Sequence, residues 1–590
     1  MHVFNGNRVF DVIIVGAGPA GCVLASRLSE DLGKSILLIE AGPDSVPGLE
    51  HPDILDPFPV SVGNPSFHWP GVYARTGADR ANGSAPELRP YLQGFGVGGA
   101  SNINGMGADR ALPEDFDEWV EGGAEKWSWN DVLPYYRKLE HDLDYSGASA
   151  HGHLGPMPVR RLPRARWAPF TAAIGEAMQC RGLPFIDDYN SDFREGFSAA
   201  PTNSLRERRV SASMAYLTRE VRSRPNLTIL AGTRVSRIDV KVLRANGVFV
   251  SRDGTTAHIR GQEVVVSCGA IQSPALLMRS GIGPAERLTK HGIQVVAHRV
   301  GVGANLLNHP YVVLATYLPS GARQPADNPW FLQNWLRYSS HHPGCTPNDM
   351  HVIPFNKCDW HSVGQRVGAI AVAVFKSYSK GRVELTSADP LASPSVDCSL
   401  LEDRRDFDRL VKGLRFITEL LAEPLVASLR RQVFYPDERI VASLARRNNW
   451  NRFKAGLIGW ALDRASLRNA ALAKLSVDIT RLATDELALR DYVRTTAQPE
   501  YHVCGTCRMG RPDDEEAVVD SDGRVIGVDA LRVVDASVFP TIPRANTHFT
   551  VLMAAEKLAD CIKLDWRRQG SPGRSDLNVD EGSVPARRLA

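Results

Sequence analysis

The run from Asp11 to Gly21, Asp-Val-Ile-Ile-Val-Gly-Ala-Gly-Pro-Ala-Gly, constrains the fold of this chain more than any other stretch. Its apolar, β-branched first half predicts a strand buried on both faces, and residues 19–29 predict a helix directly after it. Gly16, Gly18 and Gly21 are spaced as G-x-G-x-x-G. In this pattern the first glycine permits a tight turn, the second lets backbone approach a pyrophosphate, and the third lets the helix pack on the strand. The helix N-terminus offers unpaired N–H groups to the anion.

A second apolar strand, residues 36–39, ends at Glu40, about 20 positions after Gly21. A carboxylate at this distance accepts hydrogen bonds from ribose hydroxyls and repels a 2′-phosphate. The strand, glycine loop, helix and acid together predict a bound dinucleotide, and the alternative is a tight glycine turn without a ligand. The loop alone does not distinguish NAD from FAD.

Composition narrows the class of protein. The 590 residues exceed one typical domain, and 43% apolar residues are enough for a large core. The net charge of +3 gives no sign of nucleic-acid binding. No apolar run approaches the roughly 18 residues of a membrane span. Because the chain starts almost directly in its first strand, we expect no signal peptide.

Cysteine usage points to a reducing compartment. The nine cysteines lack framework spacing, as is typical of free thiols, so we expect a cytoplasmic protein. Cys504 and Cys507 form a C-x-x-C pair, but no second pair at zinc spacing accompanies them, and we therefore expect no metal site.

A second glycine-rich stretch repeats the G-x-G-x-x-G pattern from Gly94 to Gly99. No apolar strand precedes it, because Pro90 interrupts the residues before it, so we do not expect a second dinucleotide site. Its glycines permit very close backbone approach, and Asn102 and Asn104 supply donors beside them. A flat ring system with polar edges that lies along the loop would need such a surface.

Several ordered motifs then resemble those of the glucose–methanol–choline (GMC) flavoprotein oxidoreductases. They are residues 98–106 with 115–119, residues 269–283, residues 302–310, residues 502–510, and residues 531–538 with 546–548. The resemblance extends from about residue 10 to about residue 563 and implies that the cofactor is FAD. The chain departs from the family pattern at Phe95, which replaces a usual basic residue, and at His548, where the family often has Asn.

The resemblance implies an α/β fold, α+β overall, with a Rossmann-like FAD-binding domain and a substrate domain built on a mostly antiparallel sheet with helices. We expect the FAD-binding domain in residues 1–150, 205–305 and 500–565, the substrate domain in 151–204 and 306–499, and a disordered polar tail in 566–590. Short apolar runs at 351–355, 369–375 and 382–385 favour strands of the antiparallel sheet, and residues 406–421 predict a long helix.

Oxidation of an alcohol needs a base for the hydroxyl proton and an acceptor for the hydride, which is the flavin N5. The resemblance implies that His502 is the base and that Asn546 is its partner. Imidazole suits this task because its pKa lies near neutrality, and an amide holds the hydroxyl without competing for the proton. Tyr501 and His548 complete the expected substrate-binding set. An aromatic ring at Tyr501 favours a planar substrate, with core packing as the alternative.

The resemblance also implies the cofactor contacts. They are Gly16, Ala17, Gly18, Gly21, Glu40, Ala41, Val97, Gly99, Asn102, Asn104, Gly105, Val235, Ala270, Asp535, Ala536, Asn546 and Thr547. A helix N-terminus at Asn546 and Thr547 would offset negative charge on the reduced flavin. Some family members attach the flavin through a histidine near Ile103, which isoleucine cannot do, so we expect non-covalent FAD.

Within the family, residues 142–145, 151–156 and 545–547 resemble bacterial members that act on aromatic or furanic primary alcohols, such as hydroxymethylfurfural, aryl-alcohol and pyridoxine oxidases. We therefore expect oxidation of a small primary alcohol to the aldehyde, with O₂ or another acceptor taking the electrons. One alternative is a flavin-bound hydroxynitrile lyase, and another is a choline or aliphatic alcohol dehydrogenase with a quinone-type acceptor. A pyridine-nucleotide-dependent flavoprotein and a non-catalytic, membrane-associated flavoprotein are less favoured.

Residues 436–475 form an unusual segment with an apolar centre and basic flanks. The pattern predicts an amphipathic helix that covers the substrate domain, and the alternatives are an interfacial membrane contact or an oligomer contact. We expect weak membrane contact at most. The sequence leaves the oligomeric state open.

Overall fold

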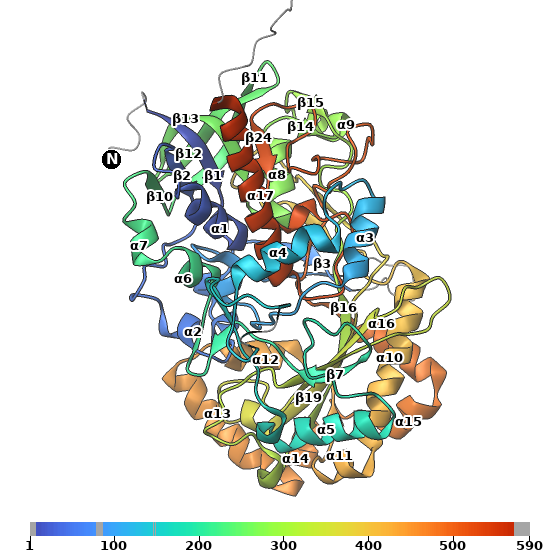
Figure 1. Ribbon diagram of the computed structural model, residues 1–590. Coiled ribbons are helices and arrows are strands. Elements are labelled where there is room, and N and C mark those ends of the chain that lie inside the picture. The colour runs from blue at the N-terminus through green and yellow to red at the C-terminus, as the bar shows by residue number, and fades with distance from the viewer. Residues whose placement is uncertain (1–7, 78–86, 146, 148, 571–590) are drawn as a thin grey trace, which may run out of the picture.

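The computed structural model describes residues 8–77, 87–145, 147 and 149–570. Two seven-stranded sheets, each with its own buried apolar cluster, form the upper and lower parts of the molecule in Figure 1. The cavity described below lies between these two parts of the protein.

The first sheet has the strand order β10-β2-β1-β13-β12-β11, with β24 paired to β13. Its strands are β1 (Val9–Val15), β2 (Ile36–Ile39), β10 (Leu227–Leu230), β11 (Arg234–Lys241), β12 (Arg244–Arg252), β13 (Thr255–Val266) and β24 (Leu531–Val533). Strands β10, β2, β1, β13 and β24 pair in parallel, and β11 and β12 add an antiparallel hairpin. All four residues of β2 are buried, as in a parallel sheet covered on both faces. The predicted Rossmann-like fold is confirmed.

The second sheet is antiparallel throughout, with the order β22-β16-β19-β18-β17-β7 and β23 paired to β16. Its strands are β7 (Gly196–Ala199), β16 (Pro310–Tyr317), β17 (Asn334–Tyr338), β18 (Met350–Phe355), β19 (Val367–Val374), β22 (Val433–Phe434) and β23 (Gln498–Pro499). The predicted long helix is α10 (Arg404–Ala422), whose buried face packs on β19. This part of the chain therefore has the antiparallel sheet that was expected.

One predicted strand belongs elsewhere. Residues 382–385 contribute β20 (Arg382–Glu384), which pairs with β21 (Ser395–Asp397). These two strands form a separate four-stranded sheet with β3 (Tyr73–Arg75) and β4 (Leu88–Pro90). Strand periodicity identified β20, but the choice of partner depended on segments far away in the sequence.

Three helices pack beside the first sheet and position the site. They are α1 (Pro19–Leu28), α4 (Trp129–Leu139) and α17 (Thr547–Gly570). A Cβ atom at Gly21 would lie 1.9 Å from the carbonyl oxygen of Gly16, so only glycine permits this approach of α1 to the preceding loop. Further helices of the described chain include α3 (Pro113–Glu121), α5 (Pro169–Cys180), α6 (Ala212–Tyr216), α8 (Gly269–Arg279), α15 (Ile479–Thr484) and α16 (Glu486–Thr496).

The predicted disordered tail begins too early at residue 566. Helix α17 continues to Gly570, and Trp566 packs against the core of the first sheet. The last turns are held because the Asp565 carboxylate pairs with both Arg524 and Arg532. Residues 571–590 lie outside the described residues.

Residues 436–475 form three helices instead of the single amphipathic helix that was predicted. They are α12 (Glu438–Ala445), α13 (Asn449–Leu462) and α14 (Ala465–Leu472), in the lower half of Figure 1. The side chain of Asn448 caps α13 by accepting a hydrogen bond from the Asn451 N–H, which starts a new helix at that point. None of the helices in the described part of the chain combines the length and the hydropathy needed to cross a membrane.

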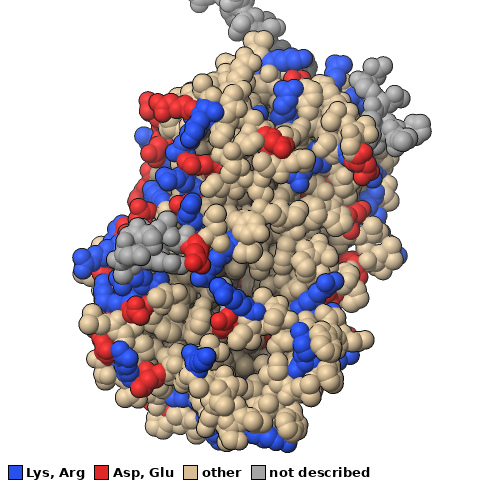
Figure 2. Space-filling view, turned by 180° about the vertical axis from the view of Figure 1, so that it is seen from behind, with Lys and Arg blue, Asp and Glu red and all other residues tan. Residues whose placement is uncertain are grey.

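Charge is mixed on the face of the molecule that Figure 2 shows. Lys and Arg side chains are interspersed there with Asp and Glu, without a continuous field of one sign. This agrees with the small net charge of the whole chain, +3.

Candidate active site

One cavity of about 1780 Å³ reaches from the first glycine loop to the antiparallel sheet. It exceeds the roughly 300–1,000 Å³ that is typical of a site for one ligand. Most of the predicted site residues line it, and these are Gly16, Gly18, Glu40, Ala41, Gly99, Asn104, Gly105, Val235, Ala270, Tyr501, His502, Asp535, Ala536, Asn546, Thr547 and His548. The fold thus gathers residues from both ends of the chain around one space.

Four predicted cofactor contacts do not line the cavity, and these are Ala17, Gly21, Val97 and Asn102. The Ala17 N–H donates to the Glu40 carboxylate over 2.9 Å, and the Asn102 amide donates to the Val97 carbonyl over 2.9 Å. The structure places these residues behind the cavity wall, where they shape the loops that face the cavity.

The end of the cavity beside β1 is built from two glycine loops in direct contact. Gly16 has a φ of +97°, and a Cβ atom there would lie 2.5 Å from the Ser267 carbonyl oxygen. A Cβ atom at Gly99 would lie 2.8 Å from the Gly18 Cα, so the second loop packs on the first. No side chain caps α1 at Gly18, which leaves backbone N–H groups for an anion. This end of the cavity fits the pyrophosphate of a dinucleotide.

Glu40 stands at the end of β2 and faces the cavity. Its carboxylate accepts hydrogen bonds from the Ala17 N–H and, over 2.8 Å, from the Gly42 N–H. Burial raises the pKa of this carboxyl, and these N–H donors act in the opposite direction. The side chain is therefore held in one orientation at the place where ribose hydroxyls were expected.

The protonation pattern of the candidate base follows from two histidines. The His309 Nε2 lies 3.1 Å from the Pro543 carbonyl oxygen, which only accepts, so Nε2 carries the proton of neutral His309. Burial, the main cause, lowers the pKa of His309 well below its usual value, so this ring is neutral. Its Nδ1 lies 2.9 Å from the His502 Nδ1 and accepts a hydrogen bond there. The remaining nitrogen of neutral His502, Nε2, therefore carries the lone pair.

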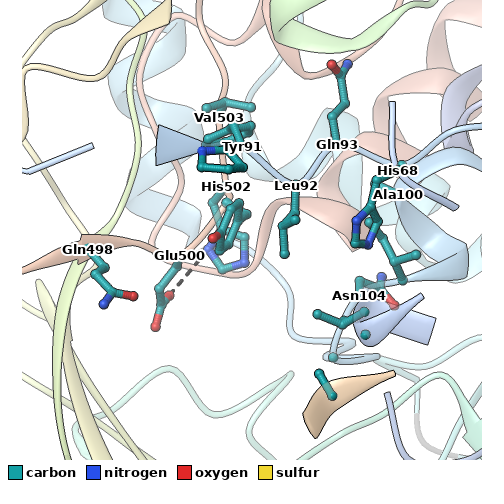
Figure 3. Close-up of a pocket in the computed structure, with 18 of the residues that line it drawn as sticks. His68, Tyr91, Leu92, Gln93, Ala100, Asn104, Gln498, Glu500, His502 and Val503 are labelled. Carbon is teal, nitrogen blue, oxygen red and sulfur yellow. Dashed lines mark ion pairs between the residues drawn. The ribbon is translucent and has the colours of Figure 1, made fainter. Parts of the chain in front are cut away.

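Glu500 supports the same ring from a second side. Its Oε2 lies 3.4 Å from the His502 Nδ1, the contact drawn as a dashed line in Figure 3. Asn104 lies on the opposite side of that view from Glu500. A carboxylate beside Nδ1 stabilises the imidazolium that forms when Nε2 takes a proton. The structure thus places His309 and the Glu500 carboxylate beside the same nitrogen of His502.

Asn546 is held by a buried acid that sequence reasoning missed. The Asn546 backbone N–H donates to one Asp109 oxygen over 3.0 Å, and its side-chain Nδ2 donates to the other over 2.8 Å. Because a carboxylate only accepts, Nδ2 faces Asp109 and Oδ1 is turned away from it. Asp109 is fully buried, and burial raises the pKa of its carboxyl to about 6.

His548 lies in the first turn of α17 and also lines the cavity. Burial, helped by the charge of Arg209, lowers the pKa of His548 to about 4, so its imidazole is neutral at pH 7. Tyr501 is partly exposed, and its ring centroid lies 5.0 Å from that of Tyr91. These side chains add an apolar and polarisable wall to the cavity.

The sequence carried a usable signal for two of the three supporting residues that were missed. His309 belongs to the Asn-His-Pro motif, and Glu500 stands two positions before His502. Nothing in the sequence marks Asp109, because its importance depends on contact with a residue more than 400 positions away.

Comparisons with known proteins agree with this geometry. Two family models described as GMC oxidoreductase match residues 10–311 and 377–555. The chain is 38% identical over 565 residues to 5-(hydroxymethyl)furfural oxidase of Methylovorus sp. (strain MP688), covering 94% of this chain and 99% of that protein. It is 32% identical over 583 residues to an oxygen-dependent choline dehydrogenase of Sinorhizobium medicae, covering 94% and 95%.

A solved structure of pyridoxine 4-oxidase from Mesorbium loti superposes with a TM-score of 0.77 and 26% identity. The match covers 94% of this chain and 99% of that one. Together with the paired glycine loops and the matched family models, this similarity establishes what kind of protein this is. The chain belongs to the GMC oxidoreductase family and is an FAD-dependent oxidoreductase that acts on alcohols.

Proposed function

We propose that the protein oxidises a small aromatic or furanic primary alcohol to the aldehyde, with His502 as the base and Asn546 as its partner. The observation that carries this proposal is the hydrogen-bonded chain from the Pro543 carbonyl through His309 to His502. These hydrogen bonds leave Nε2 of His502 as a hydrogen-bond acceptor. Both His502 and Asn546 line the cavity.

Each residue has one task in the proposed mechanism. His502 Nε2 accepts the proton of the substrate hydroxyl. Its Nδ1–H continues to donate to His309, and the Glu500 carboxylate offsets the positive charge of the imidazolium. Asn546 Oδ1, turned away from Asp109, orients the hydroxyl.

FAD supplies the hydride acceptor when it is bound. The N–H groups at the start of α1 would hold its pyrophosphate, Glu40 its ribose, and the N-terminus of α17 the pyrimidine end of the ring. We propose that FAD is held without a covalent bond. Ile103, which lines the cavity near the glycine loop, offers no nucleophile.

The wall contributed by the antiparallel sheet and its loops supports the proposed substrate class. Phe331, Trp335 and Phe355 line this part of the cavity, and the Phe331 and Phe355 rings stack with centroids 5.0 Å apart. Aromatic walls of this kind suit a planar substrate. The hydroxymethylfurfural oxidase relative supports the same class.

We also propose the domain division expected from the sequence and a reducing, cytoplasmic setting. All strands of the first sheet come from the segments assigned to FAD binding, and all strands of the second sheet come from the others. The nine cysteines are all free, and four of them, Cys22, Cys398, Cys504 and Cys507, are buried. Such thiols are typical of a reducing compartment.

Anaerobic reduction of the purified flavoprotein tests the function. 5-(Hydroxymethyl)furfural or benzyl alcohol should bleach the flavin until air is admitted, and choline should do so poorly. Faster bleaching by choline would transfer the proposal to a choline dehydrogenase, as the second relative suggests. Cleavage of a cyanohydrin without bleaching would identify a lyase. Reoxidation by air distinguishes O₂ from a quinone-type acceptor.

A further inference from the structure

Helix α13 carries its large apolar side chains on the outside. Trp450, Phe453, Leu457 and Trp460 recur at spacings of three and four and are between 55% and 65% exposed. At 3.6 residues per turn, these positions share one face of the helix. A surface helix of a water-soluble protein normally shows the reverse arrangement, with its apolar stripe turned inward.

The inward face of α13 carries no aromatic residue and is formed by Asn451, Ala455, Gly459 and Leu462. Ala455 and Gly459 are buried, and a Cβ atom at Gly459 would lie 3.0 Å from the Ser362 hydroxyl. The Ser362 hydroxyl in turn donates to the Ala455 carbonyl. Close packing on this side fixes the rotation of the helix, so the exposed aromatic stripe is built into the fold.

Basic side chains accompany the stripe. The guanidinium of Arg464 lies 3.4 Å from the centroid of the Trp460 ring, and the Lys454 ammonium lies 5.9 Å from that of Trp450. Within the described part of the chain, no carboxylate lies at salt-bridge distance from Arg452, Lys454 or Arg464. Aromatic rings with unneutralised cations beside them are typical of surfaces that sit at a bilayer interface.

The active-site cavity reaches the molecular surface beside this helix, among other places. Ile440 and Val441 of α12 and Ile458 of α13 are exposed to solvent and also line the cavity. An apolar rim around an opening leaves a surface that water solvates poorly. The rim and the α13 stripe come from neighbouring helices, which pack on each other.

We propose that helix α13, together with the exposed residues of α12, docks the protein on an anionic lipid surface with this opening of the cavity toward the lipid. The stripe supplies apolar area to the acyl boundary, and the basic residues pair with lipid phosphates and carboxylates. A second copy of this chain is a poorer occupant, because a two-fold contact would bring the same arginines and lysines face to face. The proposal does not depend on which alcohol is oxidised.

Vesicle co-sedimentation of the full-length, FAD-loaded protein tests this surface. Binding to phosphatidylcholine vesicles that contain phosphatidylglycerol should be at least about tenfold tighter than to phosphatidylcholine alone. That preference should disappear near 1 M salt, where the Debye length falls to about 3 Å. Leu457→Ser should weaken binding to the mixed vesicles by about tenfold. The double variant Arg452→Gln, Lys454→Gln should lower the preference for vesicles with phosphatidylglycerol over phosphatidylcholine alone by about tenfold.

Matched controls come from the other side of the same domain. Leu487→Ser changes a leucine on α16 that is more exposed than Leu457, at 78% against 56%, and Lys412→Gln changes an exposed lysine on α10. Neither control should alter vesicle binding, and Leu457→Ser should leave turnover of a water-soluble alcohol and the melting temperature unchanged. Equal binding by Leu457→Ser and wild type would overturn the proposal. So would a dimer in sedimentation velocity that Leu457→Ser dissociates, because a second copy would then cover the stripe.

Discussion

Replacement of Asp109 by Asn separates the stability of this enzyme from its activity. In the folded protein burial raises the pKa of Asp109 to about 6, against about 3.9 for an unfolded chain. Below about pH 3.9 the carboxyl is protonated in both states, so it has no effect on the free energy of unfolding. As the pH rises from about 3.9 through 6, this free energy falls by about 1.36 kcal/mol for each pH unit, which amounts to about 3 kcal/mol. Asn cannot ionise and avoids this loss.

The free energy of unfolding of Asp109→Asn, compared with wild type, should therefore increase by about 3 kcal/mol between pH 4 and pH 8. Melting temperatures recorded across this pH range on the FAD-loaded proteins measure the trend. The sign is the critical feature, because a carboxylate that stabilised the fold through an ion pair would give the opposite trend.

The same substitution should slow catalysis. An asparagine at position 109 accepts only one of the two hydrogen bonds that Asn546 donates there, and its own NH₂ group opposes the other. Asn546 then loses its fixed orientation, and a misplacement of this kind slows the chemical step by about 10- to 100-fold. Anaerobic stopped-flow reduction of the flavin by alcohol measures this step directly.

A second buried acid provides the control. Asp406 pairs with Arg409 and accepts hydrogen bonds from Tyr378 and Ser379. None of these contacts involves the candidate base or its partner. Asp406→Asn should lower the melting temperature and leave flavin reduction within a few-fold of wild type. Two results would refute the role assigned to Asp109. One is a rate of flavin reduction in Asp109→Asn equal to that of the wild type, and the other is a difference in stability that does not grow with pH.

Four further outcomes are expected. His502→Ala should retain FAD but slow flavin reduction by about 10²- to 10⁴-fold and abolish the acid limb of the pH profile. His548→Ala should neither slow reduction to this extent nor abolish the acid limb. The reverse result would move the base to His548. His309→Ala should slow reduction about tenfold or more and change the pH at which the acid limb falls, because Nδ1 of His502 loses its acceptor, and an unchanged profile would show that the pair does not matter. His151→Ala should lower the free energy of unfolding by about 3–5 kcal/mol, because the ring is buried among three carboxylates. Since the pKa of His151 is raised to about 10, its stabilising effect is complete below about pH 6.5 and is lost as the pH rises through 10. Thermal melts of both proteins at pH 7 and above pH 10 measure this difference. Acid precipitation should release all of the FAD into the supernatant, and yellow colour retained by the polypeptide would contradict non-covalent binding.

The sequence by itself determined those parts of the protein whose physics is local. The strand, the glycine turn and the helix of residues 9–28 are contiguous, so spacing alone predicted the dinucleotide end of the cavity, and the structure has these elements there. Linear motifs likewise predicted the family and singled out His502 and Asn546, both of which line the cavity. Helix and strand periodicity located α10 and β19 for the same reason.

Only the tertiary structure decided how these residues are tuned and oriented. His502 and His309 are 193 positions apart, and Asp109 and Asn546 are 437 apart, so no sequence window contains either pair. Burial shifts the pKa values of His309 and Asp109, and burial depends on how distant segments pack. The outward face of α13 has the same origin. Its composition was visible in the sequence, but packing against residues 362–366 set which side meets the solvent.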